Sequence, residues 1–352
     1  MAYVVTGLSD YVQDNKDLIT KDIVLGAKSI DSATIQPGVK GSANLNMLAV
    51  APAFQDGSSC GWNASGDTTF SKRTIVAGDV KINMAFCKKT LIGKWTEYLV
   101  RFGNNNDEMP FGKYVMNEVQ KEIKKWMEKM VWQGDVTNNS DLFDGWLTIL
   151  NAASGTIKKT IASGKTAYEA IYQVYMAIPE EILETEGLCI RVSPKVFRAF
   201  AKELTDKNMY HYAADDVRQI ILPGTNCPVI MTEGLADATG TNYRKIVATY
   251  DRNRVFGTDM MDDQEDISLK FSEDNDEWRL KANWNAGVQV AFPDLVVLGT
   301  MAADPADTSS SDVALGKIAE GVEGIAEGVE GIATGVTGLN ADDKVFKTKE
   351  QA

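Results

Sequence analysis

The sequence predicts an α+β protein in which one long helix packs against antiparallel strands. Two observations carry this prediction. Residues 111–135 repeat apolar side chains with a helical period, whereas residues 267–292 alternate apolar and polar side chains with a period of two. Of the 352 residues, 44% are apolar and 24% are charged, so the chain can bury a sizeable core and does not have the composition of a disordered protein.

Residues 1–45 are predicted to form an extended arm with one short helix. The segment is polar, has scattered glycines and a single proline, and shows no sustained period. An arm of this kind has little apolar surface to bury in its own fold, so we expect it to lie on another copy of the chain.

A Gly/Ser-rich excursion follows and carries two strand-like runs, at residues 68–76 and 80–86. The residues between the runs, Ala77-Gly78-Asp79, have the composition of a hairpin turn, so we expect the two runs to pair with each other. A two-stranded ribbon is only marginally stable alone in water. We therefore expect this one to pack against something outside its own domain.

The clearest helix prediction is Phe111–Asp135, FGKYVMNEVQKEIKKWMEKMVWQGD. Asn106, Asp107 and Pro110 provide a start, and Gly134 provides a stop. At a rise of 1.5 Å per residue, about twenty residues give a rod of roughly 30 Å. The apolar stripe of this helix consists of Phe111, Val115, Val119, Ile123, Trp126 or Met127, and Met130.

The middle of the chain mixes helix and strand signals. Thr166 and Glu169 form a capping-box pattern that begins a helix ending near Ile178. A buried strand is predicted at 188–192, and a helix follows it, capped by Ser193 and begun by Pro194. Two further strand-like regions are predicted, at 220–235 and at 243–257.

Residues 267–292 are predicted to form a long antiparallel hairpin with one apolar face. The segment SEDNDE, residues 272–277, provides the turn. An apolar run at 296–300 closes the body, and residues 302–311 have linker composition. The alternating apolar residues are Ile267, Leu269, Phe271, Trp278, Leu280, Ala282, Trp284, Val288, Val290 and Phe292.

The net charge of −13 argues against a protein that binds nucleic acid through clustered Lys and Arg. It is compatible with a protein that stays soluble at high concentration or that faces nucleic acid without adhering to it. No secretory signal and no stretch of ~20 apolar residues is present, so we expect a soluble chain.

The cysteines are too far apart for a CxxC pair, and neither a disulfide framework nor a zinc site is expected. They are Cys60, Cys87, Cys189 and Cys227.

We predict no catalytic, cofactor or metal site. His211 is the only histidine and lacks the flanking residues of a catalytic triad, and no glycine-rich phosphate-binding motif is present. The acidic residues within 257–277 lack the spacing of an EF-hand loop, so we expect solvated loops there. One alternative stays open, a soluble enzyme whose unrecognised acidic site includes Asp262 and Asp263.

Near the C-terminus, three near-copies of a seven-residue phrase occur in IAEGVEGIAEGVEGIATGVTGLN, Ile318–Asn340. Their apolar spacing is that of a heptad seam. Two glycines in each heptad cost a helix ~0.8–1 kcal/mol apiece relative to alanine, so a lone tail should fray, although copies held close together could form a bundle. The alternative is a flexible low-complexity extension. The seam residues are Ile318, Val322, Ile325, Val329, Ile332, Val336 and Leu339.

The order of these elements resembles the major capsid protein of tailed bacteriophages, which has the Hong Kong 97 fold. The predicted helix at 111–135 resembles the spine helix of that family. CIRVSPKVFRAFAKEL is similar to its strand–[ST]-P–helix element, and PGTNCPVIMTEGL resembles the Gly-x-x-x-Pro-Val strand that follows. The excursion at 56–89 matches the extended loop of the family by position and composition. The resemblance covers roughly residues 20–300.

The resemblance implies a division of the chain into domains. It gives an N-terminal arm (1–45), an extended loop with flanking strands (46–110), a peripheral domain with the spine helix (111–150), an axial domain (151–255), a long hairpin and return of the peripheral domain (256–301), and a linker with the heptad tail (302–352).

The resemblance also implies a function. The chain would be a non-enzymatic subunit that self-assembles as pentamers and hexamers into an icosahedral virion capsid around double-stranded DNA, in the host cytoplasm. A portal and a decoration protein would be partners. The short arm leaves no room for a cleaved scaffolding segment, so a separate scaffolding protein is expected. An encapsulin-type nanocompartment shell, which has the same fold, is the alternative.

Contacts with neighbouring subunits are expected at the extended loop and the spine helix. The family's Lys–Asn cross-link is not carried over, because no motif singles out one of Lys72, Lys81, Lys88 and Lys89. The residues predicted to make these contacts are Trp62, Phe70, Lys72, Ile75, Lys81, Trp126 and Trp132.

Overall fold

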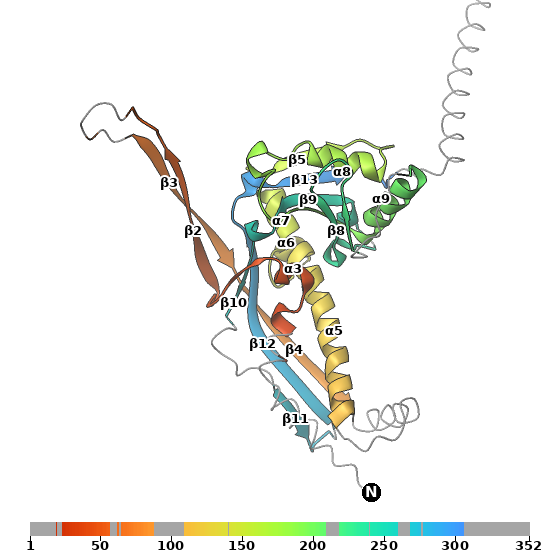
Figure 1. Cartoon of the computed structure of the whole chain (residues 1–352). Helices are drawn as coiled ribbons and strands as arrows, with labels where there is room; N and C mark the ends of the chain where they lie inside the picture. Colours follow the sequence, from red (N-terminus) through yellow and green to blue (C-terminus); the bar gives the residue numbers. More distant parts are fainter. Residues whose placement is uncertain are drawn as a thin grey trace, which may run out of the picture.

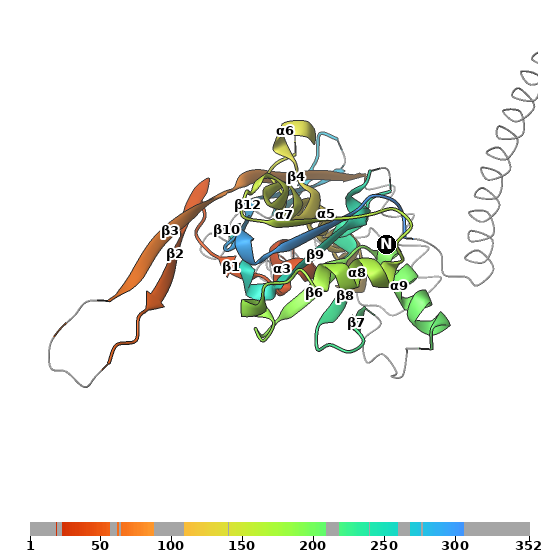
Figure 2. The same cartoon turned by 90° about the horizontal axis from the view of Figure 1, so that it is seen from above.

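In the computed structural model of this chain, the described residues are 19, 23–56, 62, 65–87, 109–139, 141–208, 218–238, 240–259, 268–275 and 277–305. They form an elongated body from which a two-stranded ribbon projects, as Figures 1 and 2 show from two directions. Within these residues, no helix is both long and apolar enough to cross a membrane. Predictions that fall outside them concern Cys60, Lys88, Lys89, His211, Asp262, Asp263 and the heptad seam.

The longest helix, α5 (Met109–Gln133), confirms the predicted spine helix and runs beside a sheet in the lower part of the body (Figure 1). The sheet has the strand order β1–β10–β12–β11, and β4 also pairs with β12. Two short helices, α6 (Val136–Asn139) and α7 (Trp146–Ala152), follow α5. The strands are β1 (Thr34–Gln36), β4 (Gly78–Cys87), β10 (Arg254–Thr258), β11 (Ser268–Ser272) and β12 (Glu277–Val290).

The predicted long hairpin is present as β11 and β12. Leu269 lies opposite Leu280 and Phe271 lies opposite Trp278 in an antiparallel register. Trp278, Leu280 and Trp284 are all buried in the same core cluster as the apolar stripe of α5. The apolar face of α5 and the apolar face of the β11–β12 hairpin therefore pack together in one core. Each element has such a face because its sequence period places the apolar residues on one side.

A second sheet has six strands in the order β5–β13–β9–β6–β8–β7, and α8 (Ala167–Tyr175) and α9 (Pro194–Asp206) pack on it. The predicted caps are confirmed, since Thr166 accepts a hydrogen bond from the Glu169 amide and Ser193 from the Val196 amide. The strands are β5 (Ile157–Ile161), β6 (Leu188–Val192), β7 (Gln219–Ile221), β8 (Pro228–Met231), β9 (Lys245–Tyr250) and β13 (Val297–Met301). Single turns of 3-10 helix lie at Glu180–Ile182, Glu233–Leu235, Asn242–Arg244, Asp251–Asn253 and Pro293–Leu295.

Two connections join the two sheets. The strand-like region at 243–257 is two strands, β9 and β10, which belong to different sheets and are separated by the turn at Asp251–Asn253. β13 pairs with β5 and β9, so the end of the segment 256–301 lies in the six-stranded sheet. Its residues Val297 and Leu298 are both buried, as expected of a strand that is covered on both faces.

The segment before β1 lies in the core, which corrects the expectation of an arm without contacts in its own fold. Ile23, Ala27 and Ile30 are buried against α5 and β12, and α3 (Lys28–Asp31) lies beside α5. β1 then pairs in parallel with β10. The prediction failed because these few apolar residues, three or four apart, make one short helical stripe inside a segment that is polar on average.

The ribbon is formed by β2 (Ser42–Pro52) and β3 (Gly66–Val76), and the predicted hairpin across Ala77-Gly78-Asp79 is wrong. β3 pairs with β2, whereas β4 pairs with β12. Gly78 does not serve a turn between paired strands. It lets the chain pass the Leu142 backbone, where a Cβ atom would lie only 2.0 Å from the carbonyl oxygen.

Candidate assembly site

The β2–β3 ribbon is the most exposed element of the described chain. Its two strands are paired from Ser42–Val76 at the root to Pro52–Gly66 at the far end, which is 11 residues per strand. At about 3.4 Å per residue such a ribbon is roughly 35 Å long. Both views show it leaving the body at the junction of the two sheets (Figures 1 and 2).

Large apolar side chains on and beyond this ribbon face solvent. Phe54 is 98% exposed, Trp62 is 95% exposed and Phe70 is 78% exposed. Covering one side chain of this size stabilises a contact by ~1.5–3 kcal/mol. Because aromatic residues are the commonest anchors of protein interfaces, these side chains make the ribbon the candidate surface for binding protein.

The structure divides the residues predicted to contact neighbours into two groups. Trp62, Phe70, Lys72, Lys81 and Trp126 are exposed, so their contacts with other subunits stay predictions. Ile75 and Trp132 are 0% exposed, which makes the prediction wrong for both. Their side chains are enclosed by residues of the same chain that are distant in sequence, and a strand or helix pattern alone does not reveal such partners.

Several contacts hold the root of the ribbon to the body. Ile75 packs with Val39 and Val255 in a small buried cluster. Gln289 of β12 donates a hydrogen bond of 2.7 Å to the Thr74 carbonyl. At Gly287 a Cβ atom would lie 2.4 Å from the Val76 carbonyl oxygen, so the ribbon crosses β12 at backbone contact. The ribbon is therefore fixed in direction at its base.

A shallow hollow of about 610 Å³ lies over β4, β11 and β12. Met84 and Phe271 contribute to its lining and are 38% and 37% exposed. Lys270, Arg279 and Lys281 line it as well. The register places these three basic residues on the face of the sheet opposite to Met84 and Phe271.

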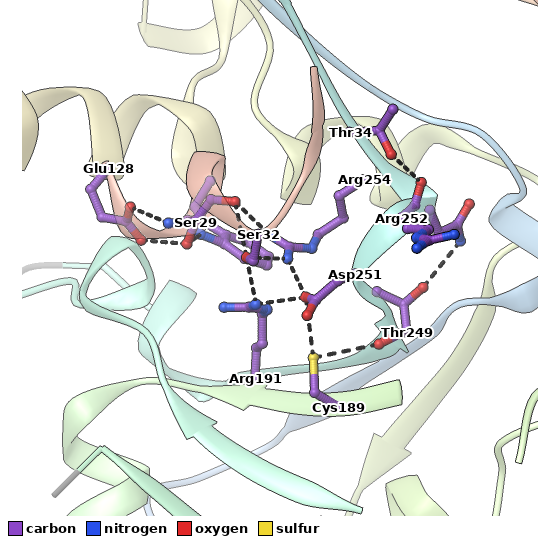
Figure 3. A network of polar contacts seen from close by, with 12 residues as sticks. Ser29, Ser32, Thr34, Glu128, Cys189, Arg191, Thr249, Asp251, Arg252 and Arg254 are labelled. Carbon is purple, nitrogen blue, oxygen red and sulfur yellow. Dashed lines mark hydrogen bonds and ion pairs between the residues drawn. The ribbon is translucent and has the colours of Figure 1, made fainter. Parts of the chain in front are cut away.

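A network of polar contacts ties the N-terminal segment to α5 (Figure 3). The Glu128 carboxylate accepts a hydrogen bond of 3.0 Å from the Ser29 amide and one of 2.5 Å from its hydroxyl. The Trp132 indole donates to the same hydroxyl at 2.8 Å. Ser29 and Glu128 are both buried, so these hydrogen bonds replace the hydrogen bonds to water that each group makes when it is exposed to solvent.

The same network continues to two buried arginines, which meet one carboxylate (Figure 3). Asp251 accepts from Arg254 at 2.5 Å and from Arg191 at 2.7 Å, and both arginines also donate to the Ser32 hydroxyl at 2.9 Å. Burial by itself would raise the pKa of Asp251, but the positive charges of Arg191 and Arg254 hold it below its usual value. Burial and the neighbouring Arg191 lower the pKa of Arg254 to about 10. All these groups are therefore charged at neutral pH.

We predict that this network makes the fold sensitive to acid. A carboxyl group whose pKa is lower in the folded chain stabilises the fold above its unfolded value, about 4, and loses that effect as pH falls through the folded value. The free energy of unfolding should thus decline below about pH 4, and less so in the Asp251→Asn variant. Urea titrations of both proteins at neutral pH and at about pH 3 measure this. An identical decline in both would contradict it.

Among the described residues, the candidate metal ligands and the buried thiols bear on catalysis. No group of three or more His, Cys, Asp or Glu among them is placed to hold a metal ion. Burial raises the pKa of Cys189 and, with a smaller contribution from Cys189, raises that of Cys227 to about 12. Both thiols therefore stay protonated at neutral pH and are poor nucleophiles.

Two features of the site were missed by the sequence predictions. Phe54 lies just before the Gly/Ser-rich segment, and an aromatic residue in such polar surroundings is itself a signal of an exposed anchor. Arg191 lies inside the apolar strand 188–192, all of which is buried. A buried arginine requires a partner, so its position in that run was the available signal of the network.

Solved phage structures are similar to this chain in fold. A chain of the satellite phage P4 procapsid, in a structure that includes the size determination (Sid) protein, matches with a TM-score of 0.56 and 12% sequence identity, over 83% of this chain and 92% of that one. A chain of Gordonia phage Cozz matches with a TM-score of 0.53 and 12% identity, over 79% and 87%. No family model and no curated protein matches the sequence. The likeness confirms the Hong Kong 97-type capsid fold.

Proposed function

We propose that this chain is the major capsid protein of a tailed phage, which assembles as pentamers and hexamers into an icosahedral shell around double-stranded DNA. The observation that carries the proposal is the projecting β2–β3 ribbon with its almost fully exposed Phe54 and Trp62. The fold shared with a chain of the P4 procapsid supports it. In this function the chain is a structural protein and not an enzyme.

The hollow over β4, β11 and β12 is the surface that we propose for the ribbon of the next subunit. Its basic side chains, Lys270, Arg279 and Lys281, would lie against the ribbon. Asp67, at the start of β3, would face these basic side chains. A contact in which one surface of a copy meets a different surface of the next can close into a ring, as pentamers and hexamers require.

This function gives the two sheets separate roles. The six-stranded sheet with α8 and α9 would be the axial domain around the centre of each ring, and α5 with the β12 sheet would be the peripheral domain. An overall charge of −13 would keep packaged DNA from adhering to the shell wall. A portal, a separate scaffolding protein and a decoration protein would join the assembly in the host cytoplasm.

The direct test is the particle that the purified full-length chain forms. Light scattering after gel filtration, together with negative-stain microscopy, should show rings, capsomers or closed shells, with or without a scaffolding protein. A chain that stays monomeric at every concentration and salt tested would refute the proposed function.

We predict that the C-terminal heptads are not needed for assembly. A chain truncated after Ser311 should form particles of the same diameter as the full-length chain, because a segment of linker composition separates the heptads from β13. Particle diameter in micrographs of the two proteins measures this. Loss of particles on truncation would show that the heptads contribute to the shell.

A further inference from the structure

A basic cleft lies between the N-terminal segment, α5 and β8, apart from both the ribbon and the hollow. Its volume is about 420 Å³. The basic side chains that line it are Lys28, Lys121, Lys124, Lys125, Arg191 and Arg218. A cluster of this kind is unexpected in a chain whose net charge is −13.

The negative groups in the cleft only partly balance these charges. Glu128 is engaged by Ser29, and Asp251 is shared by two arginines. Glu233 is the remaining carboxylate of the lining. Outside the cleft, Glu118 and Glu122 approach Lys121 and Lys125 only to 3.8 Å, and such exposed pairs contribute ~1 kcal/mol or less. Six basic side chains and three carboxylates therefore line the cleft.

Two buried polar side chains of the lining each have one atom without a hydrogen-bond partner among the described residues. Arg191 is 5% exposed and Thr232 is 3% exposed. Among the described residues, the Arg191 Nε and the Thr232 hydroxyl have no hydrogen-bond partner. An unsatisfied buried polar group costs ~1–3 kcal/mol, so a ligand that supplies an acceptor here would be favoured. A carboxylate is such an acceptor and matches the fork of an arginine.

The shape and lining of the cleft favour a peptide over a bare anion. Ala27, Ile230 and Met231 provide apolar surface beside the lysines. A ligand that alternates aliphatic and acidic side chains would satisfy both. The chain carries such a segment in its own tail, where Glu320, Glu323, Glu327 and Glu330 alternate with valine and isoleucine. Lys317 is the only basic residue in the sequence from 306 to 343.

We propose that the acidic heptad segment 318–332 of this chain docks in the basic cleft, with its glutamates on the lysines of α5. The glutamates are three or four residues apart, as are Lys121 and Lys125, and this spacing is one helical turn, ~5.4 Å. Residues 306–319 can span up to ~50 Å between the end of the described chain and the first glutamate. The tether keeps the segment at high effective concentration, which offsets the low intrinsic helix stability of its glycines.

Zero-length carbodiimide cross-linking of the full-length chain tests the docking, because it joins only carboxylates and amines in contact. Mass spectrometry should find links from Glu320–Glu330 to Lys121, Lys124, Lys125 or Lys28. The Lys121→Glu/Lys125→Glu double variant should reduce their yield at least fivefold. Lys129→Glu is the matched control, since it lies exposed on the same helix outside the cleft, and it should leave the yield unchanged.

A tail variant keeps the test decisive if the α5 variant fails to fold. Glu320→Lys/Glu327→Lys should lower the yield by the same factor, and its changes lie outside the core. Combined with the α5 variant, it should restore links in the reverse sense, from tail lysines to glutamates on α5. Links to Lys72 and Lys81 at the same yield as to the cleft would overturn the proposal. So would full yield in the α5 variant. Neither outcome bears on whether the chain forms shells.

Discussion

Replacing Phe54 and Trp62 together with aspartate is expected to leave a folded chain that no longer assembles. Both side chains are at least 95% exposed in the isolated molecule, so the free energy of unfolding should change by less than ~0.5 kcal/mol. Truncating one aromatic anchor of an interface typically costs ~2 kcal/mol or more. Here two anchors are lost, and each substitution also places a charge in a contact that must exclude water.

The effect should be large because the contact repeats at every subunit. In a ring each copy gives one ribbon and receives one, so weakening this single contact weakens all of them. A loss of about 4 kcal/mol per contact raises its dissociation constant by roughly three orders of magnitude. At ordinary protein concentrations that is enough to replace shells with monomers.

Gel filtration with light scattering measures the assembly state, and circular dichroism with urea unfolding measures the fold. Thr69→Asp is the matched control, because it adds a charge to an exposed residue of β3 without removing an apolar side chain. The control should assemble like the wild-type chain. Shells of wild-type yield from the Phe54→Asp/Trp62→Asp protein would exclude the ribbon as the assembly contact.

The sequence was sufficient to predict those elements whose residue pattern lies within one continuous segment. The α5 stripe, the β11–β12 alternation and the caps at Thr166 and Ser193 all depend on residues within one or two turns or across one tight hairpin. Such local patterns follow directly from the 3.6-residue and two-residue periods. The exposure of Trp62 and Phe70 was predictable for a similar reason, since large aromatic residues in a Gly/Ser-rich segment have no local core to enter. Their contacts with other subunits stay predictions.

The sequence was insufficient where pairing is long-range. β3 could pair with either neighbour along the chain, and the residues at 77–79 resemble a turn in both cases. The observed pairing depends on two glycines. Gly287 lets the chain at Val76 cross β12 at close contact, and Gly78 lets the chain pass the backbone of Leu142. Ile75 was wrongly placed in an interface because the residues that enclose it, Val39 and Val255, are far away in sequence.

The corrected N-terminal segment changes which parts of the proposed shell can move independently. An arm lying wholly on a neighbour would be ordered only by assembly, whereas Ile23 and Ile30 are already in the core of one molecule. The ribbon is fixed at its root in the same way by Gln289. The isolated chain thus presents a rigid ribbon with an exposed tip, which lowers the entropy lost on binding.

Replacing Arg254 with alanine is expected to be the most destabilising single change in the body. Its guanidinium is fully buried, donates to the Ser29 carbonyl at 3.0 Å and pairs with Asp251. It also lies 5.0 Å from the ring centre of Trp146. The substitution removes all three contacts, leaves the Ser29 carbonyl with only the 3.4 Å hydrogen bond from the Ser32 hydroxyl, and opens a cavity. Breaking a buried ion pair in this way costs ~3–5 kcal/mol.

Urea unfolding of the unassembled chain measures the loss, and Arg252→Ala is the matched control. Arg252 is exposed two residues away, so removing its side chain should change the free energy of unfolding by no more than ~0.5 kcal/mol. Arg254→Met separates charge from volume, because it fills most of the space while Asp251 keeps its bond to Arg191. We expect its loss to be smaller than that of Arg254→Ala. If Arg254→Ala were no more destabilising than Arg252→Ala, the junction of α3, α5 and β10 would have to be held by its apolar contacts alone.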